Sequence, residues 1–251
     1  MNITYFSLTR EYEIRCKSFL PENGDVEAVI IGVHGFAGDK QSSALQQLAL
    51  SCTKHRAALI CFDFPAHGDS SVNEEKFSVQ NCKSDLLAVA QYVNEKYPDA
   101  RKCVFATSFG GYITLLSAKY LDKYTFVLRA PAVTMPKVLT ENILHISRDE
   151  FRKAGVVKCG FDRPLMLPYC FCEELVAQED VCKSFVLQPT LVIHGGCDDI
   201  VPCADVEAFV HAQCNVKLQI LKDADHRFKK PGEMETVIRY TMEFLHLTSA
   251  D

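Results

Sequence analysis

Short apolar segments alternate with helical patterns along most of the chain. Two opening segments, at residues 4–8 and 12–19, are expected to form antiparallel strands. The later apolar segments are nearly continuous and lack polar alternation, which is typical of strands covered on both faces of a sheet. They lie at residues 28–33, 57–62, 102–106, 125–128, 190–194 and 216–221.

Between these segments, apolar residues recur every three or four positions, which predicts amphipathic helices. The patterns cover residues 45–52, 79–97 and 234–245, and the last follows Pro231-Gly232. Strands that alternate with such helices predict an α/β fold, with a mostly parallel sheet and helices on both of its faces. The composition agrees, because 48% hydrophobic and 24% charged residues are normal for a globular chain with a sizeable core.

Residues 134–188 interrupt this alternation. They contain no strand of the main series and are far too many for an ordinary connection between a strand and a helix. Helical patterns are predicted at residues 136–153 and 172–183, with glycines and the turn Arg163-Pro164 between them. We therefore expect a single domain over residues 1–251, in which residues 134–188 form an inserted lid over the edge of the sheet where ligands bind.

Charge and composition argue against several other classes of function. The net charge of −5 is unsuited to a nucleic-acid partner, which usually requires a basic face. Charged side chains interrupt residues 1–20, and the longest uncharged run, residues 103–118, is too short to span a membrane. We expect a cytoplasmic protein with no membrane partner. Cys170 and Cys172 lack the usual zinc-knuckle spacing, so no metal site is expected.

The strongest candidate for chemistry is the sequence VFATSFGGY at residues 104–112. An apolar strand leads into Ser108, small residues stand two positions away on each side, and an apolar helix follows. This is the strand–turn–helix context of a nucleophile elbow. Ala106 replaces the usual first glycine, a difference of one methyl group. A serine–glycine helix start without chemistry is the alternative interpretation of this motif alone.

The loop His34-Gly35-Phe36 follows another predicted strand and would lie beside the Ser108 turn in a parallel sheet. A hydrolase of this kind needs two backbone N–H groups to stabilise an oxyanion, one from each loop. The predicted donors are therefore the N–H groups of Phe36 and Phe109. A simple glycine turn at the end of a strand is the alternative interpretation.

Two later loops carry the remaining groups that acyl transfer requires. Asp198 and Asp199 follow the strand at residues 190–194, and His226 follows the last predicted strand. A serine hydroxyl needs an imidazole to take its proton, and the imidazole needs a carboxylate on its other nitrogen. The chain order serine, aspartate, histidine is the order found in such sites. Ser108 is therefore the predicted nucleophile and His226 the predicted base.

Together these motifs resemble the α/β-hydrolase superfamily, and the resemblance covers nearly the whole chain. The matching segments are His34-Gly35, FPAHGDS at residues 64–70, the Ser108 turn, His194-Gly195 with Asp198 and Val201-Pro202, and DHRF at residues 225–228. The size, the short insertion and the His-Arg-Phe ending are similar to small bacterial esterases of the cinnamoyl or feruloyl type. The resemblance implies a serine esterase that cleaves small to medium acyl or cinnamoyl esters through an acyl-serine, without a cofactor.

The resemblance also selects among the carboxylates and places the catalytic acid at Asp198. Asp199 is its nearest rival. Asp223 and Asp225 are too close in sequence to His226 to reach its far nitrogen easily. Two other functions stay open: an aminopeptidase-like or amide-cleaving hydrolase with the same triad, and a catalytically silent hydrolase-fold protein that binds a small ligand.

The insertion contains an apolar, aromatic stretch that could enclose an acyl or phenylpropenoyl group, or form the insertion's own small core. It comprises Phe161, Leu165, Met166, Leu167, Tyr169 and Phe171. The predicted substrate contacts are Leu165, Met166 and Tyr169, with Tyr169 toward a substrate hydroxyl. By the family resemblance, His67 is also expected to line or brace the pocket.

Overall fold

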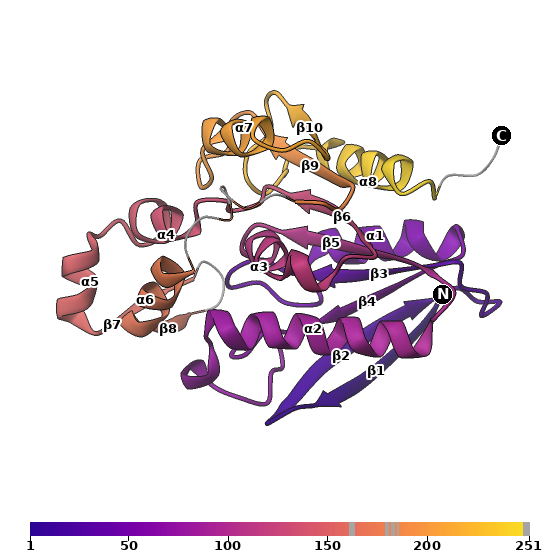
Figure 1. Cartoon of the computed structure of the whole chain (residues 1–251), viewed down its shortest axis with the longest axis horizontal. Helices are drawn as coiled ribbons and strands as arrows, with labels where there is room; N and C mark the ends of the chain where they lie inside the picture. The colour runs from indigo at the N-terminus through magenta and orange to yellow at the C-terminus, as the bar shows by residue number, and fades with distance from the viewer. Residues whose placement is uncertain (161–163, 179–180, 182–183, 185, 248–251) are drawn as a thin grey trace.

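The computed structural model of the chain describes residues 1–160, 164–178, 181, 184 and 186–247 (Figure 1). Its main sheet is built from β1 (Asn2–Thr9), β2 (Glu13–Leu20), β3 (Ala28–Val33), β4 (Ala57–Phe62), β5 (Arg101–Thr107), β6 (Tyr124–Arg129), β9 (Thr190–Gly195) and β10 (Val216–Leu221). Every apolar segment predicted as a strand is one of these.

The eight strands lie in the order β1-β2-β4-β3-β5-β6-β9-β10. β2 pairs antiparallel with both β1 and β4, and all other pairs in the sheet are parallel. The predicted fold class, an α/β fold with a mostly parallel sheet, is confirmed. Because the carboxyl ends of β3, β5, β6, β9 and β10 meet at one edge, the loops that follow these strands lie together.

Helices cover both faces of the sheet. They are α1 (Ser43–Lys54), α2 (Val79–Lys96), α3 (Phe109–Ser117), α7 (Cys203–His211) and α8 (Glu233–Phe244), with short 3-10 turns η1 (Glu74–Lys76) and η2 (Ala118–Tyr120). On β3, Ile31 packs with the core under α2 and α3, whereas Ile30 packs with the core under α1 and α8. Burial on both faces explains why β3, β4 and β9 show no polar alternation. The prediction that residues 216–221 are also covered on both faces is wrong, because β10 lies at the edge of the sheet and none of its residues is fully buried.

The segment between β6 and β9 gathers beyond one end of the sheet, at the left of Figure 1. It consists of α4 (Met135–Lys137), the π-helix η3 (Val138–Leu144), α5 (Arg148–Ala154), the antiparallel strands β7 (Val156–Cys159) and β8 (Leu165–Pro168), and α6 (Tyr169–Ala177). Among the described residues, no helix has both the length and the apolar composition needed to cross a bilayer.

The prediction of one helical run over residues 136–153 is wrong. His145 has a left-handed backbone with φ of 53°, which ends η3, and a new helix begins after Ser147. Ser147 and Glu150 form a capping box, in which each side chain accepts from the other residue's backbone N–H. The predicted second helix begins at Tyr169. Its predicted end, like Phe161 and Arg163, lies outside the described residues.

Candidate active site

Ser108 occupies a sharp turn between β5 and α3. Its backbone has φ of 51° and ψ of −116°, a region that non-glycine residues rarely adopt. The turn is tied to the neighbouring strand β6 because the Ser108 N–H donates to the Arg129 carbonyl at 2.9 Å. A side chain at Gly110 would place its Cβ 2.4 Å from the His34 carbonyl oxygen. Glycine at this position therefore lets α3 pack closely against the loop after β3.

The structure brings Ser108, His226 and Asp198 into one chain of hydrogen bonds. The distance from His226 Nε2 to Ser108 Oγ is 3.0 Å, and that from His226 Nδ1 to Asp198 Oδ2 is 2.7 Å. The three side chains come from loops after β5, β10 and β9, which lie far apart in sequence. Each imidazole nitrogen thus faces the kind of group that a proton-transferring histidine requires.

Asp198 is held in place and kept ionised by its surroundings. Its side chain is fully buried, and its Oδ1 accepts from the backbone N–H groups of Ile200 at 2.9 Å and Val201 at 2.7 Å. Burial raises the pKa of this carboxyl, but the hydrogen bonds from His226 and from the Val201 N–H outweigh it and leave the pKa below its usual value. The rival Asp199 is exposed and has no contact with His226 among the described polar contacts.

The predicted oxyanion donors flank Ser108. Within the described residues, the N–H groups of Phe36 and Phe109 donate to no protein acceptor. Phe109 is the first residue of α3, where backbone N–H groups lack helical partners. The other loop comes close, because a Cβ on Gly35 would lie 3.3 Å from the Ser108 Cβ. Both N–H groups are thus available to a ligand at Ser108.

The nearby histidines support these loops. His67 is buried; its Nε2 accepts from the Ala37 N–H at 3.1 Å, and its Nδ1 lies 2.8 Å from the Pro65 carbonyl oxygen. It therefore fixes the backbone immediately after Phe36. His34 accepts from a backbone N–H through Nε2, and burial lowers its pKa to about 4. Such neutral, buried imidazoles are suited to bracing.

A cavity of about 280 Å³ opens at Ser108. It is lined by His34, Gly35, Phe36, Ala37, Gly38, Ser42, Ser43, Ala44, Thr107, Ser108, Arg129, Ile143, Ile200, His226 and Arg227. Ile143, from η3, is the insertion's contribution to this set. The two predicted oxyanion loops and two members of the hydrogen-bond chain therefore share one cavity.

The predicted substrate contacts do not line this cavity. Leu165 and Tyr169 are buried within the insertion, where the Tyr169 ring packs edge-on against Phe151 at 5.3 Å. Met166 lies on the surface with 49% exposure. Because β8 alternates its side chains between the insertion's core and solvent, neither face of the strand reaches Ser108.

Sequence reasoning missed Arg129, Ile143 and Ile200 as residues of the cavity. Arg129 carries the one signal that was available. It is a cation at the carboxyl end of a strand that is otherwise apolar, beside the strand that ends at Ser108. Ile143 and Ile200 look like ordinary core residues in the sequence.

Comparisons with known proteins agree on the fold. A family model described as "Serine aminopeptidase, S33" matches residues 24–155. A search of the curated proteins finds no match. Among solved structures, Est1E from Butyrivibrio proteoclasticus with ferulic acid bound has a TM-score of 0.82 at 22% identity, with 97% of this chain and 99% of that chain covered.

Two further structures are similar over their whole length. A hydrolase from Agrobacterium vitis has a TM-score of 0.79 at 18% identity, covering 97% of this chain and 98% of that chain. Alpha/beta hydrolase domain-containing protein 10 from mouse has a TM-score of 0.77 at 19% identity, covering 98% and 100%. At these identities the likeness concerns the fold.

Proposed function

The chain belongs to the serine aminopeptidase (S33) family of α/β hydrolases, and from that premise we propose that it cleaves carboxylic esters through an acyl-serine intermediate. The observation that carries this proposal is the chain of hydrogen bonds from Asp198 through His226 to Ser108, which ends at a cavity. In this proposal Ser108 is the nucleophile, His226 the base and Asp198 the acid that orients the base.

The first half of the reaction transfers the acyl group to the protein. Ser108 Oγ attacks the ester carbonyl carbon while His226 Nε2 takes the hydroxyl proton, and the carbonyl π electrons move to oxygen. The N–H groups of Phe36 and Phe109 donate to that oxyanion. The carbonyl re-forms as the bond to the alcohol oxygen breaks, and His226 gives its proton to the departing oxygen.

The second half repeats these steps with water. His226 takes a proton from the water, whose oxygen attacks the acyl-serine carbonyl. Collapse of the second tetrahedral intermediate breaks the bond to Ser108 Oγ, which receives the proton from His226. Asp198 stabilises the imidazolium in both halves without being protonated itself, in keeping with a pKa below its usual value.

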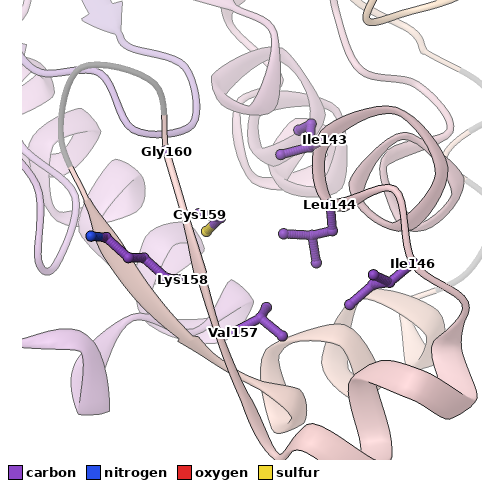
Figure 2. Close-up of a pocket in the computed structure, with 7 residues that line it drawn as sticks. All are labelled: Ile143, Leu144, Ile146, Val157, Lys158, Cys159 and Gly160. Carbon is purple, nitrogen blue, oxygen red and sulfur yellow. The ribbon is translucent and has the colours of Figure 1, made fainter.

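A second cavity, lined mostly by apolar side chains together with Lys158, supports an acyl group as the part of the substrate that contacts the insertion. It has a volume of about 390 Å³, and Leu144, Ile146 and Val157 point toward one another across it (Figure 2). Ile143 lines both this cavity and the one at Ser108. We propose that the insertion acts as a lid and that an acyl chain bound to Ser108 extends past Ile143.

Amide cleavage by the same residues is the second candidate, because the family description names an aminopeptidase. Such an enzyme has to hold the α-ammonium group of its substrate, for which a carboxylate is the matching partner. Within the described residues, no aspartate or glutamate lines the cavity at Ser108. This favours the ester over the aminoacyl amide.

The test is a panel of 4-nitrophenyl esters, from acetate to octanoate and including a ferulate ester, set against aminoacyl 4-nitroanilides. We expect kcat/KM for at least one ester to exceed that for every anilide, and Ser108→Ala to abolish the hydrolysis. Preferential turnover of the anilides would establish the aminopeptidase alternative. If neither series is turned over and a fluorophosphonate does not label the protein, the chain is the catalytically silent form.

A further inference from the structure

Arg129 is a nearly buried cation in the wall of the cavity at Ser108. It ends β6, is 9% exposed and lines the cavity together with Ser108 and His226. Its Nε donates to Thr107 Oγ1 at 3.2 Å and its Nη1 to the Arg227 carbonyl at 3.3 Å. Both acceptors are neutral, so they orient the guanidinium without balancing its charge.

No carboxylate pairs with this guanidinium among the described residues. Its hydrogen bonds there use only Nε and Nη1, and it takes part in no ion pair within 4.0 Å. Asp198 and Asp225 are the carboxylates whose charges act on it most strongly. Asp198 is engaged by His226, and Asp225 accepts from the backbone N–H groups of Arg227 and Lys229. Arg129 therefore has unused donors.

A buried charge without a partner is costly for a folded protein. Burial lowers the pKa of Arg129 to about 10, which still leaves the side chain charged at neutral pH. Its guanidinium carbon lies 5.4 Å from the centre of the Phe228 ring, a contact that offsets part of this cost. The charges of Asp198 and Asp225 offset a further part, and the unused N–H groups of Arg129 are left to the solvent or to a ligand in the cavity.

The cavity is cationic although the chain has a net charge of −5. Arg129 and Arg227 line it, while no aspartate or glutamate does so within the described part of the chain. A neighbouring cavity of about 410 Å³ shares Ser43 and Arg227 with it and adds Lys229 and Lys230, together with one carboxylate, Glu235. Ile143 and Ile200 contribute apolar side chains to the same cavity. The cavity thus combines apolar and cationic side chains.

We propose that the ester substrate carries a carboxylate, which Arg129 binds while the scissile carbonyl lies at Ser108. This inference rests on the proposed function and adds to it the class of substrate. A planar guanidinium with unused N–H groups matches a carboxylate in shape and charge. Hydrogen bonds to charged groups contribute enough to change kcat/KM by about tenfold or more.

The experiment compares neutral and anionic esters in two matched pairs. In the acyl pair, 4-nitrophenyl butyrate is set against 4-nitrophenyl hemisuccinate. In the leaving-group pair, 4-carbamoylphenyl butyrate is set against 4-carboxyphenyl butyrate. Each pair changes the charge while keeping the size similar, and the pair that responds locates the carboxylate. Wild type, Arg129→Met and the exposed-site control Arg239→Met are compared.

We expect wild type to prefer the anionic ester by at least about tenfold in one pair, Arg239→Met to keep that preference, and Arg129→Met to lose it. The readout is the ratio of kcat/KM within each pair, so the neutral ester serves as the internal reference for every variant. If Arg129→Met does not fold, the wild-type preference decides alone. Neutral esters hydrolysed without any anionic preference, or a preference retained in Arg129→Met, would overturn this inference and leave the proposed function intact. No hydrolysis of any ester would instead contradict the proposed function.

Discussion

The loops at the carboxyl edge of the sheet and the insertion between β6 and β9 are built in different ways. The loops follow buried parallel strands whose register is fixed, so that Ser108 is hydrogen-bonded to the end of β6 and packed under the loop after β3. The insertion consists of short elements around its own core, with a π-helix and a left-handed residue at His145. The groups whose relative positions must be held to within a few tenths of an ångström come from the loops at the sheet edge. The insertion contributes Ile143 to the cavity.

Substitutions in the loops should therefore affect chemistry, whereas substitutions in the insertion should affect stability or selectivity. Loops anchored to a sheet hold the reacting groups rigidly, as electrostatic stabilisation of a transition state requires. Because the insertion has its own small core, residues of the insertion that contact substrate can be substituted without moving the reacting groups.

The largest effect is expected in the loops. Ser108→Ala should lower kcat by at least ~10⁴-fold, because the nucleophile and the base act as one unit. The fold should persist, because the side chain faces the cavity and supports no core packing. Ester hydrolysis measures the first effect, and thermal unfolding followed by circular dichroism measures the second. Turnover close to wild type would refute Ser108 as the nucleophile.

Asp198→Asn should cost on the order of 10⁴ in kcat, because the amide favours the wrong tautomer of His226. The matched control is Asp199→Asn, which changes an exposed carboxylate in the same loop and should alter kcat far less. Steady-state kinetics on one ester compares the two variants. If Asp199→Asn proves the more damaging, the carboxylate has been wrongly assigned.

In the insertion, Leu165→Ala should act on stability. Leu165 is 3% exposed, so the cavity left behind should lower the free energy of unfolding by about 2–5 kcal/mol. Its neighbour Met166 is 49% exposed, and Met166→Ala should change that free energy by about 0.5 kcal/mol or less. Urea unfolding measures both. Altered ester selectivity with unchanged stability in Leu165→Ala would instead support the sequence-based prediction that Leu165 contacts the substrate.

Ile143→Ala should act on selectivity. Ile143 lines both cavities, so removing its side chain should change the ratio of kcat/KM for octanoate and acetate esters by about 10- to 200-fold. The acetate rate should change little, because a short acyl group does not reach η3. Equal losses on both esters would show that the insertion supports the fold without contacting the acyl chain.

The sequence predicts the first region well and the second poorly. Strands buried on both faces are apolar throughout, so they are easily recognised in the sequence. Ser108, an aspartate and His226 each follow a strand of this sheet, and their order along the chain identifies them as a set at one edge of the sheet. The insertion lacks such constraints. Its strand β7 contains Lys158 and has only four residues, so it carries no clear period. The π-helix and α5 share one apolar pattern that hides the break at His145.

The residues that line the cavity at Ser108 were hard to predict for a related reason. Aromatic and apolar composition is the same for a small core and for a binding pocket, so Tyr169 could not be assigned to one of them from sequence. Arg129 is the opposite case. Its charge ends an apolar strand, but only the register of β6 with β5 places it next to Ser108.

The proposed function requires that His226 and Asp198 activate Ser108 as a nucleophile. The most direct measurement is the mass of tryptic peptides after reaction with a fluorophosphonate, which labels activated serines. We predict a phosphonate adduct on Ser108 in wild type and its loss in His226→Ala, with the protein still folded. An unlabelled Ser108 in folded wild-type protein, or an adduct on another residue that persists in Ser108→Ala, would contradict the claim.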